Sequence, residues 1–219
     1  LDTGWNGGFE ADHAFATGFG NDDVYIKRVV GNHQFSLDYS LRYRDYKKRL
    51  TSDDYRYRIE DTEYAHLYNS RDKFGYTTHD VNMKFSQNIS GSHTFQIAFS
   101  PKFETNFEQA NSQILSLDGQ GYREENGEED SHIRTFNPSL DVYFSKNLPH
   151  EQEIVVDLTG TYYYNEQKRN KYEVSSENEE CLMNDDMKLR NHKKSLIGEV
   201  AYTKKNGLST ISIGYKATL

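Results

Sequence analysis

The sequence predicts an all-β fold: an antiparallel, up-and-down segment of a transmembrane β-barrel with about nine strands, short periplasmic turns and long extracellular loops. Apolar and polar residues alternate with a period of two, which is typical of strands that have one apolar and one polar environment. The alternating stretches last about 9–11 residues, the length of a tilted strand that crosses a bilayer. The connections between them are alternately short and long, as in outer-membrane barrels.

Composition agrees with this fold class. The chain has 219 residues, a net charge of -8 and a mean hydropathy of -0.92. It has no apolar run long enough for a transmembrane helix, whereas barrel strands keep a low hydropathy because half of their residues are polar. The 17 Tyr, 12 Phe and only 3 Pro favour strands over disorder. The negative charge argues against a nucleic-acid partner.

The first three strands are predicted at 6–17, 22–30 and 33–48. The first is weakly marked. The second presents Val24 and Ile26 on one face, and Gly31-Asn32 after it suits a tight turn because both residues tolerate a positive φ. The third is the clearest, since apolar residues from Phe35 to Tyr43 alternate with polar ones.

The next three strands are predicted at 76–88, 93–103 and 132–146. Val81 and Phe85 mark one face of the fourth strand, and Ser90-Gly91-Ser92 provides the turn into the fifth. The fifth strand alternates strictly from Phe95 onward, and the sixth repeats the pattern around Val142. Each of these strands therefore has one apolar face.

The last three strands are predicted at 151–172, 190–203 and 208–217. Ile154 begins the apolar face of the seventh, Val200 lies on that of the eighth, and Ile213 lies on that of the ninth. Asn206-Gly207 is a strong hairpin signal between the last two strands.

The connections predict the orientation of the strands. Short turns are expected at 31–32, 90–92, 147–151 and 204–207, and long acidic loops at 49–75, 105–131 and 173–189. Antiparallel neighbours place all short turns at one end, which is the periplasmic end in outer-membrane barrels. The charged end of the third strand, Arg44 to Arg49, predicts a polar extension above the outer leaflet.

The alternation assigns side chains to two faces. Residues predicted to face lipid are Phe35, Leu37, Tyr39, Leu41, Tyr43, Phe95, Ile97, Phe99, Leu140, Val142, Phe144, Ile154, Val156 and Leu158. Residues predicted to face the lumen are Asp38, Arg42, Arg44, Lys84, Gln96, Asp141 and Glu199. The basic members either line a solute path or pair with the acidic ones across neighbouring strands. Tyr43, Tyr162, Tyr164 and Tyr202 suit the two aromatic girdles.

Three stretches, Ser36–Arg49, Asn137–Pro149 and Ser195–Tyr202, resemble the barrel of outer-membrane proteins related to TonB-dependent receptors. The resemblance implies a 22-stranded barrel with a plugged lumen. Residues 1–219 would then form a single, incomplete domain, under half of the wall and without the plug. It also implies the outer membrane of a Gram-negative bacterium. The implied partners are the lipid bilayer, the remainder of the barrel and its plug, an energy-transducing inner-membrane complex and a surface lipoprotein.

No catalytic motif, metal-ligand spacing or cofactor signature is found, so we expect no enzyme activity and no cofactor. His132 and the lone Cys181 are expected in solvated acidic loops, Gly18-Phe19-Gly20 is expected in a turn, and the acceptor-like Asn88-Ile89-Ser90 is treated as chance. The first eight residues lack the pattern of a signal peptide. The sequence does not identify substrate-binding residues.

Three functions are compatible with these patterns. The first is a wall segment of a receptor or transporter for nutrient uptake. The second is a surface-exposed barrel that binds partners through its acidic loops. The third is a soluble all-β binding protein or enzyme, which requires the apolar faces to meet in a dry interior.

Overall fold

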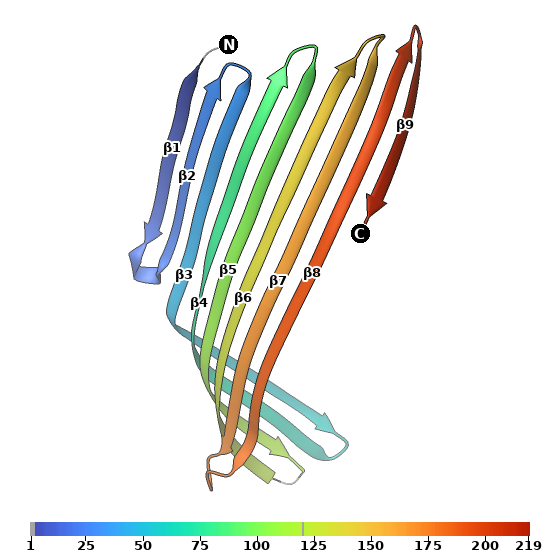
Figure 1. Ribbon diagram of the computed structural model, residues 1–219. Coiled ribbons are helices and arrows are strands. Elements are labelled where there is room, and N and C mark those ends of the chain that lie inside the picture. Colours follow the sequence, from blue (N-terminus) through green and yellow to red (C-terminus); the bar gives the residue numbers. More distant parts are fainter. Residues whose placement is uncertain (1–2, 120) are drawn as a thin grey trace.

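The computed structural model describes residues 3–119 and 121–219, which form a single curved antiparallel sheet (Figure 1). Position 120, within one of the expected loops, and positions 1 and 2 lie outside the described residues. The strands follow one another in the order β1 to β9. They are β1 (Gly4–Ala14), β2 (Phe19–Val30), β3 (His33–Ile59), β4 (Thr62–Ile89), β5 (His93–Asp118), β6 (Gly121–Leu148), β7 (Gln152–Ser175), β8 (Cys181–Asn206) and β9 (Ser209–Thr218). The all-β, antiparallel, up-and-down prediction is thereby confirmed.

The predicted short turns all lie at one end of the sheet, the upper end in Figure 1. Gly31, Gly91 and Gly207 have φ values of 56°, 72° and 60°, a backbone region that glycine adopts without a steric penalty. The turn between β6 and β7 instead places His150 and Glu151 at positive φ. The four predicted turns are therefore confirmed in order, and three of them in place; residues 204–206 of the fourth belong to β8, and that turn lies at 207–208.

The predicted long loops are wrong. Residues 49–75, 105–131 and 173–189 belong mostly to strands, and β3 to β8 are 24 to 28 residues long. Their backbones remain paired far beyond the apolar stretch, for example from Arg49↔Asp72 to Ile59↔Thr62. Hydropathy missed these extensions because their apolar residues are few and lie on both faces, as Tyr57 and Leu115 do, so no single apolar face marks the strands. The acidic clusters accordingly lie in strands and at their tips.

Several local predictions change with this correction. The first strand ends at Ala14, and residues 15–17 form a short 3₁₀ helix closed by Gly18, whose φ is 59°. His132 lies within β6, and Cys181 is the exposed first residue of β8 rather than a loop residue. In the described residues no helix is both long and apolar enough to cross a membrane.

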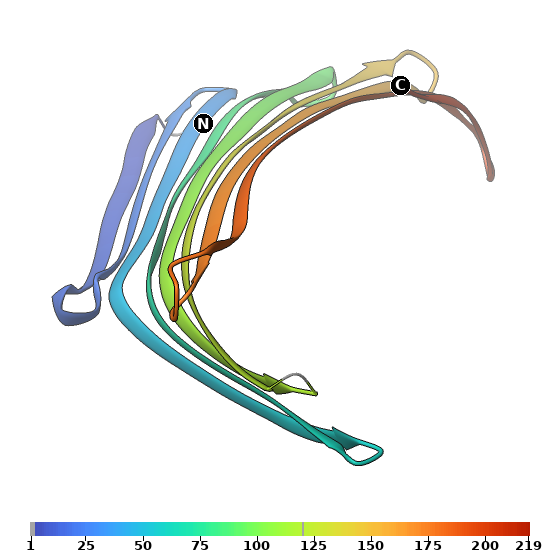
Figure 2. The same ribbon diagram turned by 90° about the horizontal axis from the view of Figure 1, so that it is seen from below.

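The two faces of the sheet differ in curvature. In the half of β6 away from the short turns, which we call the outer half, Glu128, Asp130 and His132 are exposed. In the same half Glu129 and Ser131 are half-buried and Gly127 is buried. Side chains crowd together on a concave surface and spread apart on a convex one. The face of Glu129 is therefore concave; Figure 2 shows how the sheet as a whole curves. We call the two faces of the sheet the convex face and the concave face.

The sheet has almost no core of its own. Ile114 is the one hydrophobic residue classed as buried in the described residues, at 9% exposure. Many large apolar side chains are at least 38% exposed, among them Phe35, Phe99, Leu140 and Leu158. Packing within this sheet therefore does not explain why the chain carries so many large apolar side chains.

Gly75 of β4 allows the strands to approach closely near the bend. A Cβ atom at this position would lie 2.4 Å from the Arg44 carbonyl oxygen and 2.6 Å from Cε1 of Phe107. We expect Gly75→Ala to destabilise the sheet by about 1–3 kcal/mol, because the added methyl group overpacks the site. Equilibrium unfolding in detergent micelles measures this.

Gly160→Ala is the matched control for Gly75→Ala. The nearest atom to a Cβ at Gly160, Cδ1 of Leu196, lies 3.9 Å away, which is ordinary contact. We expect this variant to be as stable as the parent or slightly more stable, since alanine is the less flexible residue. Equal losses in both variants would contradict the packing argument.

Candidate functional site: an apolar convex band and a polar concave face

The strand register places every predicted lipid-facing residue on the convex face. Directly opposed residues share a face. Phe35 opposes Phe85, which opposes Ile97; Ile97 opposes Val142, which opposes Leu158. The same face carries Phe9 and Val24 on β1 and β2, and Val200 and Ile213 on β8 and β9. The apolar residues thus form one continuous band across nine strands, although their contact with lipid stays a prediction.

The band has the height of a membrane crossing. Phe35 to Tyr43 on β3 and Phe95 to Phe103 on β5 each span nine residues, and Ile154 to Tyr164 on β7 spans eleven. A strand that crosses a bilayer at a tilt needs about 9–11 residues. The geometry therefore agrees with the length estimated from the sequence.

Aromatic rings gather at the border of the band that lies away from the short turns, which we call the aromatic border. Phe103 stacks on Phe136 with ring centroids 4.6 Å apart, and Phe136 meets Tyr162 edge-on at 6.2 Å. Tyr164 stacks on His192 at 6.3 Å. The predicted girdle residues Tyr43, Tyr162 and Tyr164 lie along this border, and Tyr202 lies near the short turns. Rings with an apolar body and a polar tip suit a membrane–water boundary.

The predicted lumen-facing residues all lie on the concave face. Register pairs connect Asp38 with Asn82, Gln96 with Ser86, and Asp141 with Ala98 and Thr159. The expected pairing among these residues differs from the observed contacts: Glu199 lies 3.5 Å from Lys216, and Asp141 accepts a hydrogen bond from Thr159 at 2.8 Å. The Arg44 guanidinium lies over the rings of Phe19 and Tyr46.

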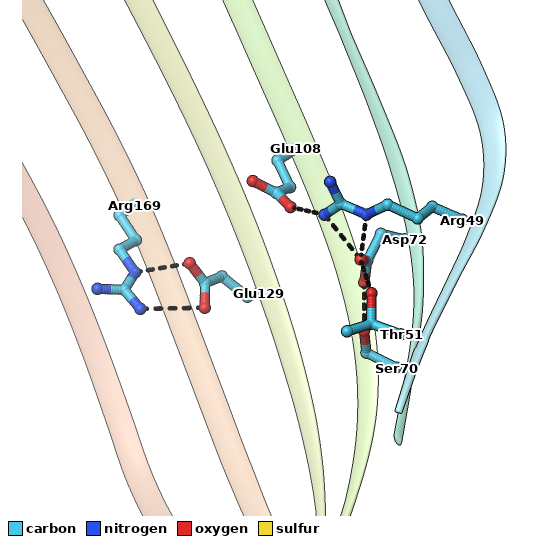
Figure 3. A network of polar contacts seen from close by, with 7 residues as sticks. All are labelled: Arg49, Thr51, Ser70, Asp72, Glu108, Glu129 and Arg169. Atoms are coloured by element: carbon cyan, nitrogen blue, oxygen red, sulfur yellow. Dashed lines mark hydrogen bonds and ion pairs between the residues drawn. The ribbon is translucent and has the colours of Figure 1, made fainter. Parts of the chain in front are cut away.

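A polar network on the concave face was not predicted from the sequence. Arg49 Nε donates to Asp72 Oδ2 at 2.9 Å, and Arg49 Nη2 donates to Glu108 Oε1 at 2.6 Å (Figure 3). Ser70 donates to Asp72 Oδ1 at 2.7 Å, and Thr51 donates to Oδ2 at 3.4 Å. Asp72 is only 4% exposed, so these donors replace the water that its charge would otherwise need.

The network sits where β3 bends. A register shift between Tyr46 and Arg49 inserts one extra residue into β3 and so reverses which of its positions lie on the concave face. Arg49 then also lies 4.5 Å above the ring of Phe74. Its ion pair with Asp72 raises the pKa of Arg49, so the guanidinium stays charged. The network therefore fixes the bend between the apolar half and the polar half of the strand.

A neighbouring ion pair joins two further strands. Arg169 of β7 donates to both oxygens of Glu129 of β6, at 2.7 and 3.0 Å, the two-pronged geometry that arginine favours with carboxylates. Between this pair and the bend lies a concave pocket of about 430 Å³. Its lining includes Phe74, Tyr76, Glu104, Asn106, Glu108 and Ile133.

A carboxylate on the convex face, just beyond the aromatic border, has a strongly lowered pKa. Glu166 accepts from Arg190 Nε at 2.6 Å and from the Tyr164 hydroxyl at 3.0 Å, and Lys168 Nζ lies 3.5 Å away. The hydrogen bond from Arg190, followed by that from Tyr164, lowers the pKa of Glu166 from 4.5 to about 2. The group is therefore ionised at every physiological pH.

This pKa has a consequence for acid stability. A carboxyl whose pKa is lower in the folded state stabilises the fold above its unfolded pKa and loses that effect as the pH falls. We expect the parent to be more stable than Glu166→Gln at pH 7, and the difference to shrink between pH 4.5 and about 2. Unfolding curves of both proteins across this range measure it; a difference independent of pH would contradict the assignment.

In the described residues no group of three or more His, Cys, Asp or Glu side chains could hold a metal ion. Sequence reasoning found the two faces but missed the network, because Arg49, Asp72 and Glu108 are far apart in the sequence. The available signal was the break in alternation at Lys47-Lys48, which marks the register shift.

Comparisons with known proteins leave the family of this chain open. No protein-family model matches it, and no curated protein matches it. Similar solved structures include a pore forming protein with 8% identity, covering 90% of this chain and 91% of that chain at a TM-score of 0.24. Another is the Clostridium perfringens NetB toxin in the membrane inserted form, with 7% identity, 90% and 96% coverage and a TM-score of 0.23. TM-scores this low do not establish a shared fold.

Proposed function

We propose that this chain is a wall segment of a β-barrel in the outer membrane of a Gram-negative bacterium, of the TonB-dependent receptor type, that serves nutrient uptake. One observation carries the membrane part of the proposal: a continuous apolar band covers the convex face of nine strands. Lipid on the outside and a polar lumen on the inside explain both faces at once.

The soluble alternative fits the sheet less well. It needs the apolar side chains to meet in a dry interior, but a convex surface turns them away from each other. Almost no hydrophobic side chain is buried among the described residues. Contiguous exposed apolar patches of this extent mark contact with a membrane or a protein.

The two edges of the sheet indicate what completes the barrel. β1 and β9 lie at the ends of the strand order, so each has one row of backbone groups that this sheet does not pair. Unpaired backbone groups cost several kcal/mol each in hydrocarbon. Further strands of the barrel would pair them, and a plug inside the lumen would meet the concave face.

The receptor-type part of the proposal rests on the strand signatures that resemble TonB-dependent receptors. We propose two partners: an energy-transducing inner-membrane complex, which would drive uptake, and a surface lipoprotein. Uptake by the complete barrel in cells is the test. It should stop when the proton gradient is removed, and uptake that continues without the gradient or the plug would contradict the proposal.

Insertion into lipid is tested by the fluorescence of Trp5, the single tryptophan of the chain. Trp5 lies on the convex face opposite Arg28 and is 63% exposed. In vesicles of brominated phosphatidylcholine we expect strong quenching of this fluorescence, because bromine atoms on the acyl chains would contact the ring. Unchanged fluorescence in a folded, vesicle-bound sample would contradict the membrane proposal.

A second function, partner binding at the surface, is favoured by the paired extensions of β3 to β8. They present a preformed concave pocket beyond the apolar band instead of flexible loops. Shortening the β3–β4 and β5–β6 hairpins by equal numbers of residues in each strand separates the two functions. Loss of partner binding with intact permeation would favour this second function.

A further inference from the structure

A belt of positive charge lies on the convex face directly beyond the aromatic border. In the row after Phe136, Tyr164 and His192, the register aligns Arg134, Glu166 and Arg190. The following row aligns His132, Lys168 and Lys188. Lys194 lies just inside the border, over the ring of Tyr162 at 6.0 Å. We call Arg134, Lys168, Lys188, Arg190 and Lys194 the convex basic patch.

The charge of this patch is local and specific to one face. The chain as a whole carries -8, and the next row outward, Asp130, Asn170 and Asp186, is acidic. On the concave face at the same height, the two rows are Thr135, Asn165 and Asn191, then Ile133, Gln167 and Leu189, which carry no charge. On these two rows the positive charge is therefore confined to the convex face, at the border of the apolar band.

Ion pairs within the patch leave some of its cations free to bind an external anion. Glu166, only 11% exposed, pairs with Arg190 and Lys168 and holds their side chains in place. Among the described residues no carboxylate oxygen lies within 4.0 Å of a charged nitrogen of Arg134, Lys188 or Lys194. A shallow cavity of about 140 Å³ lies between His132, Arg134, Glu166 and Lys168. Arg134 and Lys168 therefore border a space that an anion can occupy.

We propose that the convex basic patch binds the phosphate groups of anionic membrane lipids whose acyl chains cover the apolar band. Neighbouring strands lie about 4.8 Å apart, so the patch spans β6 to β8 over roughly the width of a lipid headgroup. Arginine and lysine are the side chains that bind phosphate, and each adds to attraction toward an anionic surface. The inference rests on the proposed membrane function, since acyl chains on the band bring the phosphate to this height.

The test uses the full chain in micelles of an uncharged maltoside detergent. Binding of short-chain phosphatidylglycerol, short-chain phosphatidylcholine and inorganic phosphate is titrated separately and measured by native mass spectrometry. We expect phosphatidylglycerol to bind at least about fivefold more tightly than phosphatidylcholine. Saturable binding of inorganic phosphate as tight as that of the lipid would overturn the lipid assignment in favour of a free-anion site.

Two sets of variants locate the binding. Lys194→Gln and Lys193→Gln remove adjacent lysines that lie on opposite faces. We expect Lys194→Gln to weaken phosphatidylglycerol binding roughly fivefold and Lys193→Gln to leave it unchanged. The double variant Arg134→Gln, Lys188→Gln should weaken it roughly 25-fold, without touching the Glu166 ion pairs.

The outcomes separate the two proposals. If Trp5 is quenched by brominated lipid but the patch variants bind phosphatidylglycerol as the parent does, the lipid-phosphate inference is wrong and membrane insertion stands. Equal weakening by Lys193→Gln and Lys194→Gln would also overturn the inference, because the effect would then not depend on the face. If Trp5 is not quenched, the membrane function fails and the lipid inference fails with it.

Discussion

A positive charge placed in the middle of the apolar band should destabilise the membrane-inserted sheet by about 2–4 kcal/mol. Ile97→Arg makes this change on β5, where Ile97 lies between Phe85 and Val142 on the convex face. The cost arises because the guanidinium must leave water for hydrocarbon, or drag water and headgroups inward. Equilibrium unfolding in lipid vesicles measures the loss.

Gln96→Arg is the matched control. Gln96 is the adjacent residue of the same strand, but it lies on the concave face beside Ser86 and Tyr143. A new arginine there stays in a polar environment, so we expect little change in the free energy of unfolding. Similar stability of both variants would contradict a lipid-facing band, and it is the result that a soluble sheet with an exposed convex face would give.

The second large effect is expected at the bend. Asp72→Ala should destabilise the sheet by about 1.5–3 kcal/mol, the range for a lost hydrogen bond to a charged group. The carboxylate is 4% exposed and accepts bonds from Arg49, Ser70 and Thr51, so its removal leaves three donors without their acceptor. Arg49 itself is 43% exposed, and water that reaches it keeps the loss below that for a fully buried pair. Chemical denaturation in micelles measures the change.

Asp54→Ala provides the comparison for Asp72→Ala. Asp54 also binds an arginine, Arg56, at 3.0 Å, but the two side chains are 44% and 76% exposed. Exposed ion pairs contribute little because water solvates both partners about as well. We therefore expect no measurable loss in this variant. Equal losses at Asp54 and Asp72 would show that burial does not set the strength of the network.

Much of the fold could be predicted from local patterns. Each apolar stretch found in the sequence is a strand, and Gly31, Gly91 and Gly207 occupy turns as expected. The two faces were also predictable, because neighbouring side chains in a strand always point to opposite sides. The face of Phe95 and the face of Gln96 therefore follow from the order of residues alone.

The extensions and the basic patch needed more than these patterns. Between Tyr46 and Tyr55 the only apolar residue of β3 is Leu50, so hydropathy carries no period there and predicted a loop where the backbone pairs regularly. The alternation returns at Tyr55, Tyr57 and Ile59, but this short stretch lies among charged residues. Basic residues do alternate at Lys188, Arg190, His192 and Lys194, which is a signal of a strand with one charged face. This alternation was not recognised because Lys188 fell in the predicted loop at 173–189 and the other three residues in the predicted strand at 190–203.

By itself, the sequence determined the all-β class, the positions of the short turns and of the apolar stretch in each strand, and the division of each stretch into an apolar and a polar side. These properties are local, since they depend on residues one or two positions apart. The tertiary structure decided how the strands align, which brings Arg49, Asp72 and Glu108 together and sets Arg134, Glu166 and Arg190 in one row. Alignment depends on turn geometry and on a register shift of one extra residue in β3. Such a shift reverses the faces of the residues that follow it in that strand.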